Sequence, residues 1–320
     1  MGFIRLDHVL CLAVLLLGTR GAFGLVVIHS DKTSQDSDFD LWDGVDGKYI
    51  NLAATNRTNS SYLDPTYYVL MGPMDSGSSL LEKLIEVNWP TRFKASSNEF
   101  MWKHSLATAE DLYSFLMTYE PLRPLSKVNF IATVRSPISQ VASWINAPYD
   151  LWSCVRRPQL DLLKPCSARL RPRRHETLPA VHFESAMDIY NKYMSLYKQV
   201  VADGRFKSAH VIPYEEMVRS PESVVRLISN IFGATLHGRP ETIDDPSKPG
   251  NTNMVKKPNG REAALQKLEK RGYLKNLDSE VVAALCSKLD RSLVEDIVES
   301  ETAKVRIPYT YDCDNWNGPH

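Results

Sequence analysis

Apolar runs alternate with helical patterns along most of the chain. Five β-favouring residues, Tyr67 to Met71, predict a strand, and apolar residues at helical spacing from Ser79 to Val87 predict a helix. The near-continuous apolar run Lys127 to Val134 is typical of a buried parallel strand. Further predicted elements are a strand over Ser208–Pro213 and helices over Ala107–Tyr119, Ile138–Asn146, Val181–Ala202, Pro221–Phe232, Arg261–Arg271 and Ser279–Val298. This alternation predicts an α/β fold with a central parallel sheet flanked by helices.

A glycine-bounded loop joins the first strand to the first helix, in the sequence YYVLMGPMDSGSSLL. Gly72 and Gly77 have the spacing of a Walker A loop, but Ser78 and Ser79 stand where that motif has Lys-Ser/Thr. Backbone N–H groups and the helix dipole at such a turn favour a bound phosphate. The missing lysine argues against an ordinary ATPase or kinase. A plain strand-turn-helix with small residues fits the same pattern, so the loop alone leaves both interpretations open.

A second pattern follows the buried strand. Arg135 comes directly after Val134, and Ser143 lies eight residues further on, within the next predicted helix. The strand end brings the arginine to the carboxyl edge of the sheet, where ligands bind in open α/β folds. An arginine and a hydroxyl at that edge suit a phosphate monoester. The alternative is a solvated strand end followed by a small helix residue.

Composition narrows the choice of partners. The 320 residues are 43% hydrophobic and 24% charged, with a formal net charge of +0 at pH 7, so no global field attracts nucleic acid or a membrane.

Residues 1–24 match a signal peptide, with Arg5 before the apolar core Val9–Leu17 and small residues at Ala22 and Gly24. An uncleaved anchor is the alternative. No later stretch is apolar enough to span a bilayer, so we expect no stable span after cleavage.

The cysteines and glycosylation motifs agree with a secretory route. Four cysteines follow the signal segment and allow three pairings; sequence proximity favours Cys154 with Cys166 and Cys286 with Cys313. No cysteine spacing matches a zinc site. Asn56 begins one N-glycosylation motif and Asn59 another.

Four motifs, in order, resemble the sulfotransferase family, whose members transfer a sulfuryl group from phosphoadenosine phosphosulfate (PAPS). They are GPMDSGSSLL, FIATVRSPISQVASW, HVIPYEEMVRSPESVVRLISNIFG and KKPNGR. The resemblance implies a three-layer P-loop-NTPase-like fold over residues 65–300, after an N-terminal extension at 25–64 and before a tail at 301–320. The secretory signal points to the branch of this family that acts on carbohydrates in the Golgi, rather than to the cytosolic branch that acts on phenols and steroids.

The resemblance also implies roles for individual residues. The loop residues Asp75, Ser76, Gly77, Ser78 and Ser79 would line the 5′-phosphosulfate of the donor. The remaining donor contacts would be Arg135 and Ser143 on the 3′-phosphate, Tyr214 near the adenine, and Lys257, Gly260 and Arg261 over the phosphates. PAPS would be the co-substrate, and no metal is expected.

One departure from the family pattern concerns the transferring group. The family loop usually carries Lys or Arg two residues before the second glycine, where this chain has Asp75. That carboxylate should repel an anionic donor unless it turns outward or caps the helix. Lys94 or Lys103 is a possible substitute cation. The acceptor hydroxyl also needs a base within hydrogen-bond reach, and the candidates are Glu99 and His104.

The sequence therefore predicts a PAPS-dependent sulfotransferase acting on a hydroxyl of a carbohydrate or glycan, in the Golgi lumen or secreted. A rival from another class is an inactive relative that binds anionic glycans, which Asp75 favours. A nucleotide kinase is a more distant alternative, because the Walker lysine is missing and the sequence does not identify the magnesium ligands that phosphoryl transfer from ATP normally needs. A cluster of basic residues would suit an anionic glycan acceptor, and an ordinary solvated loop fits the same pattern. The cluster consists of Arg156, Arg157, Arg169, Arg171, Arg173, Arg174 and His175.

Overall fold

The computed structural model describes residues 66–89, 93–95, 102–119, 122, 124–155, 158–170, 180–236, 238–243, 260–294 and 313. The chain divides into two units, and all of these residues belong to the second, Tyr62–His320. The predicted signal segment, the N-terminal extension and both glycosylation motifs lie outside the described residues.

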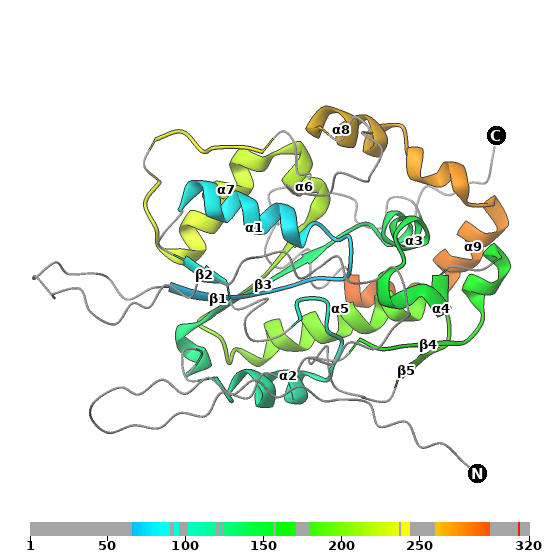
Figure 1. The fold of residues 1–320 in the computed structure, drawn as a ribbon, viewed down its shortest axis with the longest axis horizontal. Coiled ribbons are helices and arrows are strands. Elements are labelled where there is room, and N and C mark those ends of the chain that lie inside the picture. Colours follow the sequence, from blue (N-terminus) through cyan, green and yellow to red (C-terminus); the bar gives the residue numbers. More distant parts are fainter. Residues whose placement is uncertain are drawn as a thin grey trace, which may run out of the picture. The chain divides into compact units, whose positions relative to one another are not determined.

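A parallel sheet forms the centre of the described part of the chain (Figure 1). Its strands run in the order β2-β1-β3-β6, and each neighbouring pair is parallel. Their bounds are β1 Thr66–Met71, β2 Phe93–Ala95, β3 Asn129–Val134 and β6 Ser208–Pro213. A separate antiparallel pair consists of β4 Cys166–Ala168 and β5 Val181–Phe183.

Helices cover both faces of this sheet, as Figure 1 shows. They are α1 Ser78–Asn88, α2 Ala109–Leu116, α3 Pro137–Asn146, α4 Trp152–Val155, α5 Ala186–Asp203, α6 Tyr214–Arg219, α7 Pro221–Phe232, α8 Arg261–Glu269 and α9 Ser279–Ser287. Short 3-10 turns lie at Leu125–Lys127, Tyr149–Leu151, Gln159–Leu163 and Gly272–Asn276. The predicted α/β class with a helix-flanked parallel sheet is confirmed.

Alternation along β1 separates the two cores. Tyr68 and Leu70 point into one apolar cluster with α1 and α7, whereas Val69 and Met71 point into the other with α2, α3 and α5. Because successive strand side chains face opposite sides of a sheet, a strand buried on both sides is a near-continuous apolar run. All six residues of β3 are buried, as its sequence predicts.

Two predicted helices differ from the observed ones. Residues Val181–Phe183, predicted as the first turn of a long helix, instead form β5 and pair with β4. The helix begins only after Ser185, whose hydroxyl accepts from the backbone N–H of Asp188 as an N-cap. The other helix ends at Ser287, well before the predicted end at Val298, which lies outside the described residues.

The two disulfides are those that sequence proximity favoured. Cys154 on α4 is bonded to Cys166 on β4, and Cys286 on α9 is bonded to Cys313. Such bonds persist in oxidising compartments, so they are compatible with a secreted protein. In the part of the chain that the structure describes, no helix has the length and apolarity needed to cross a membrane.

Candidate functional site

The loop between β1 and α1 leaves its backbone donors at the helix start unused by the helix. Gly77, the N-cap, has a φ of 92°, and α1 has no side-chain cap. By helix geometry the first N–H groups, those of Ser78, Ser79 and Leu80, have no intrahelical acceptor. The turn therefore has the local geometry of an anion site at a helix N-terminus.

Close packing against β3 requires a glycine at the start of the loop. A Cβ on Gly72 would overlap the hydroxyls of Ser76 and Thr133 and would lie 2.9 Å from the Thr133 carbonyl oxygen. Ser76 is fully buried, and its hydroxyl is hydrogen-bonded to that of Thr133 at 2.7 Å. The Ser76 backbone N–H donates to the Pro73 carbonyl oxygen. The Ser76 hydroxyl and backbone N–H thus stabilise the loop, and the contact with the donor predicted for this residue stays a prediction.

Helix α3 holds the middle of the loop. Gln140 donates from Nε2 and Trp144 from Nε1 to the carbonyl oxygen of Met74, at 2.7 and 2.8 Å. Arg135 Nη1 lies 3.4 Å from the next carbonyl, that of Asp75. These contacts fix two successive carbonyls on the α3 side. They support Asp75 in its left-handed conformation, with a φ of 61°.

Arg135 and Ser143 meet, as their spacing predicted. Arg135 leaves the end of β3 and donates from Nη1 to Ser143 Oγ at 3.1 Å and from Nε to Ser139 Oγ at 2.7 Å. Its guanidinium lies over the Tyr214 ring, 4.6 Å from the ring centre. Because Arg135 is only 6% exposed, it is a rigid, desolvated cation beside the loop.

Tyr214 closes the other side of the loop. It begins α6, directly after β6, and a Cβ on Gly77 would lie 2.7 Å from its ring. Burial raises the pKa of Tyr214, an effect that the Arg135 charge opposes. The ring is therefore a neutral surface between the loop and the arginine.

Asp75 does not cap α1. Its carboxylate accepts a hydrogen bond from the hydroxyl of Tyr149, which lies just beyond α3 and also has a positive φ, 46°. Burial of the hydroxyl and then the Asp75 charge raise the pKa of Tyr149 to about 12. The Asp75 side chain is thus bound to a neutral phenol instead of to the N–H groups of α1.

Lys103, one of the two possible substitute cations, reaches the first turn of α1. Its Nζ donates to Ser79 Oγ at 3.1 Å and to Glu82 Oε2 at 3.0 Å. Only 6% of Lys103 is exposed. For Lys94 the structure describes the backbone in β2 but not the side chain. Lys103 is therefore a cation that the tertiary structure places at the turn.

His104 contacts the start of the loop. Its Nδ1 lies 2.7 Å from the carbonyl oxygen of Gly72, and its own carbonyl accepts from the Tyr193 hydroxyl at 2.5 Å. A carbonyl only accepts, so Nδ1 carries the proton and, in the neutral ring, Nε2 is the basic nitrogen. The other candidate base, Glu99, lies outside the described residues.

Glu215 is a buried acid that the sequence analysis did not single out. Its Oε1 accepts from the Ser136 backbone N–H at 2.9 Å, and its Oε2 is buried with no hydrogen-bond partner among the described residues. Burial raises the pKa of this carboxyl, whereas the neighbouring Arg135 lowers it. A charged residue just after the apolar strand Ser208–Pro213 was the available signal, because strand ends gather at the edge of the sheet.

The structure describes only the last two residues, Gly260 and Arg261, of the basic segment KKPNGR. Gly260 is the N-cap of α8, and Arg261 donates from Nε to the Val218 carbonyl and from Nη2 to the Arg219 carbonyl, at 2.8 and 2.9 Å. A cation suits these terminal carbonyls of α6. Arg261 therefore has a structural contact here, and the predicted contact with donor phosphates stays a prediction. Lys257 lies outside the described residues.

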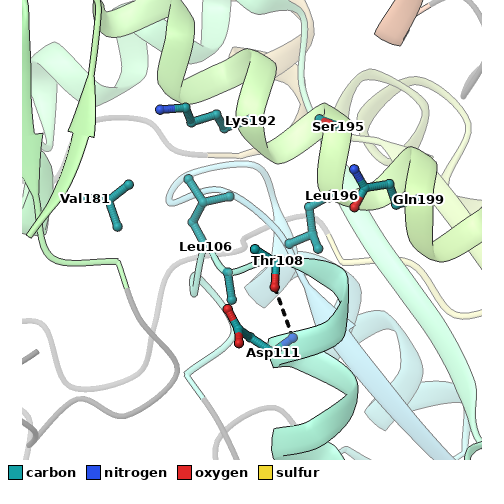
Figure 2. Close-up of a pocket in the computed structure, with 9 residues that line it drawn as sticks. Leu106, Thr108, Asp111, Val181, Lys192, Ser195, Leu196 and Gln199 are labelled. Atoms are coloured by element: carbon teal, nitrogen blue, oxygen red, sulfur yellow. Dashed lines mark hydrogen bonds between the residues drawn. The ribbon is translucent and has the colours of Figure 1, made fainter. Parts of the chain in front are cut away.

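A pocket of about 280 Å³ lies elsewhere, between α2, β5 and α5 (Figure 2). Apolar side chains from Leu106, Val181 and Leu196 line it together with several polar groups. One of the polar groups is engaged, because the Thr108 hydroxyl accepts from the Asp111 backbone N–H. None of the predicted donor or base residues lines this pocket.

Comparison of the sequence with protein-family models and with curated proteins, and of the structure with solved structures, found no match. Among the described residues, no group of three or more His, Cys, Asp or Glu side chains could hold a metal ion. The function is therefore inferred from the site itself.

Proposed function

We propose that this protein is a sulfotransferase that moves a sulfuryl group from PAPS to a carbohydrate hydroxyl in the secretory pathway, in the Golgi lumen or after secretion. The observation that carries the proposal is the convergence of Arg135, Ser143 and the loop at one edge of a parallel sheet. The arginine–serine pair and the loop come from separate segments of the chain, and each suits a phosphate group.

The donor's two anionic ends would occupy different parts of this site. Arg135 and Ser143 would bind the 3′-phosphate, because a guanidinium and a hydroxyl 3.1 Å apart can contact the same phosphate group. The N–H groups of Ser78 and Ser79 would bind the phosphosulfate end. The Tyr214 ring would offer an apolar face to the adenine. In this arrangement a P-loop-NTPase-like fold serves a donor that needs no Walker lysine.

His104 is the base that the geometry favours. Transfer requires the acceptor oxygen to lose its proton as it attacks sulfur, while the bond between sulfur and the bridging phosphate oxygen breaks. His104 has its Nδ1 proton directed to Gly72, so Nε2 can take the acceptor proton. The contact also holds the imidazole beside the loop that would carry the donor.

A non-catalytic protein that binds anionic glycans is the second candidate, and Asp75 favours it. In the family pattern a cation occupies this loop position, but here a carboxylate bound to Tyr149 does. A negative charge at that point opposes charge development on the leaving oxygen. This candidate keeps Arg135 as an anion contact without transfer chemistry.

Formation of phosphoadenosine phosphate from PAPS distinguishes the two candidates. The full secreted chain is incubated with PAPS, with and without a panel of unsulfated and sulfated glycans. We expect slow product formation by wild type with water alone, a faster rate with an acceptor glycan, and loss of the accelerated rate in His104→Gln. Glycan binding without any PAPS cleavage would support the binding protein and contradict the enzyme.

A further inference from the structure

A buried lysine, Lys103, lies beside the loop between β1 and α1 and has one N–H group that makes no hydrogen bond within the described residues. An ammonium has three N–H groups, and Lys103 directs two of them to Ser79 and Glu82. Among the described residues no third acceptor contacts it. The remaining donor is therefore available to a ligand at the first turn of α1.

The backbone fixes the position of this lysine. The Gly72 N–H donates to the Lys103 carbonyl oxygen at 3.0 Å, and the next residue, His104, contacts the Gly72 carbonyl. The segment that carries Lys103 is thus bound in both directions to the first residue of the loop. Tyr193 on α5 holds the same segment through its hydrogen bond to the His104 carbonyl.

Two contacts compensate the burial of the lysine side chain at this position. A buried charge is costly unless it is paired, and Glu82 supplies the partner at 3.0 Å. Ser79 lies one turn earlier on the same helix, so the lysine spans from the ion pair to the helix start. The contact with Ser79 is additional to the ion pair with Glu82, and it holds the ammonium at the first turn of α1.

We infer that Lys103 supplies, from outside the loop, the cation that Asp75 displaces from it. This inference rests on the proposed function. As the acceptor oxygen bonds to sulfur and its proton passes to His104, the bond from sulfur to the bridging phosphate oxygen breaks, and that oxygen takes the electron pair. The third N–H of Lys103 donates to this oxygen, which becomes part of the departing phosphoadenosine phosphate. Glu82 positions Lys103 and does not touch the donor.

The test measures donor binding and donor cleavage separately in Lys103→Met. Binding is followed by titration with phosphoadenosine phosphate, and cleavage by slow transfer of sulfuryl from PAPS to water, which needs no glycan acceptor. Loss of one transition-state donor typically lowers the rate about 10²–10³-fold, and we expect that loss with binding of the product changed less than about tenfold. Lys103→Arg should recover part of the rate.

Two further variants separate chemistry from structure. Lys192→Met removes a lysine that is paired with Asp188 at 3.2 Å on α5, and it should leave cleavage unchanged. Glu82→Gln breaks the ion pair but keeps the ammonium, so it should retain most of the rate. If Lys103 were only structural, Lys103→Met and Glu82→Gln would lower stability alike and leave the rate per folded molecule unchanged.

The outcomes distinguish this inference from the proposed function. Cleavage by wild type together with a Lys103→Met rate within about threefold of it would overturn the inference alone. Product binding without any PAPS cleavage by wild type would also overturn it. Neither binding nor cleavage by folded wild type would overturn the proposed function and the inference together.

Discussion

Replacing Gly77 by alanine should lower both the stability of the protein and its affinity at the proposed donor site. Gly77 has a φ of 92°, and a Cβ there would lie 2.7 Å from both Tyr214 Cδ2 and Met217 Cε. Two penalties therefore apply: the left-handed backbone, and an overlap with side chains on α6. The Tyr214 ring is the surface on which the Arg135 guanidinium lies.

The size of the effect follows from these two penalties. A left-handed conformation costs a residue with a Cβ about 1–2 kcal/mol, and overpacking costs about 1–3 kcal/mol. Gly77→Ala should therefore lower the free energy of unfolding by about 2–5 kcal/mol. Gly204 is the matched control, because its φ is 62° and a Cβ added there would have nothing within 4 Å. Gly204→Ala should lose only the backbone part, about 1–2 kcal/mol.

Denaturant unfolding of both variants measures the difference, and titration with phosphoadenosine phosphate measures the consequence for the site. We expect Gly77→Ala to bind the product more weakly than wild type, and Gly204→Ala to bind it equally. Equal losses of stability in the two variants would refute the close contact between the loop and α6. Unchanged binding in a folded Gly77→Ala protein would refute the role of Tyr214.

Two other predictions concern a buried charge and a disulfide. Glu215→Gln keeps an acceptor for the Ser136 N–H but removes a carboxyl whose pKa is raised by burial. A carboxyl with a raised pKa in the folded state lowers the free energy of unfolding at pH values above that pKa. The variant should therefore be more stable than wild type at pH 7, and this difference should shrink as the pH falls through the folded-state pKa, in unfolding measured at several pH values. A gain that is constant with pH would contradict this. Removing both Cys286 and Cys313 frees a loop with a sequence separation of 27; loop entropy predicts a loss of about 3–4 kcal/mol in denaturant unfolding, and a loss below about 1 kcal/mol would contradict it.

Local patterns predicted the framework of the site well. The strand and helix around the loop, the strand Ser208–Pro213 and the helix that ends before Gly233 all follow from periodicity and caps. Arg135 and Ser143 meet because a strand end and the helix that follows it return to the same edge. These relations depend on residues close in sequence, so local patterns are enough to predict them.

Contacts between distant segments were beyond such patterns. The Ser76 hydroxyl turns to Thr133, 57 residues away, and the Arg261 guanidinium turns to the end of α6, 43 residues from the Val218 carbonyl. Likewise, nothing local distinguishes Lys103 from Lys94 as the cation at the turn. Which side chain reaches a given point depends on how strands pair and helices pack, and periodicity gives neither.

The strand at Val181–Phe183 shows the same limit at the level of secondary structure. Apolar residues continue from this segment into α5, so the periodicity extends the helix over it. Pairing with Cys166–Ala168 decides the outcome, and the Cys154–Cys166 disulfide holds that partner strand in place. Tertiary pairing here overrides local helix preference.

Calorimetric titration of the full chain with phosphoadenosine phosphate tests the proposed donor site most directly. Arg135→Ala is compared with Arg205→Ala, which removes another arginine that lies over a tyrosine, 4.4 Å from the ring centre of Tyr113, away from the loop. Circular dichroism checks that both variants are folded. The proposed site predicts micromolar binding by wild type and Arg205→Ala, and its loss in Arg135→Ala. Absence of binding by folded wild type, or equal binding by all three proteins, would contradict it.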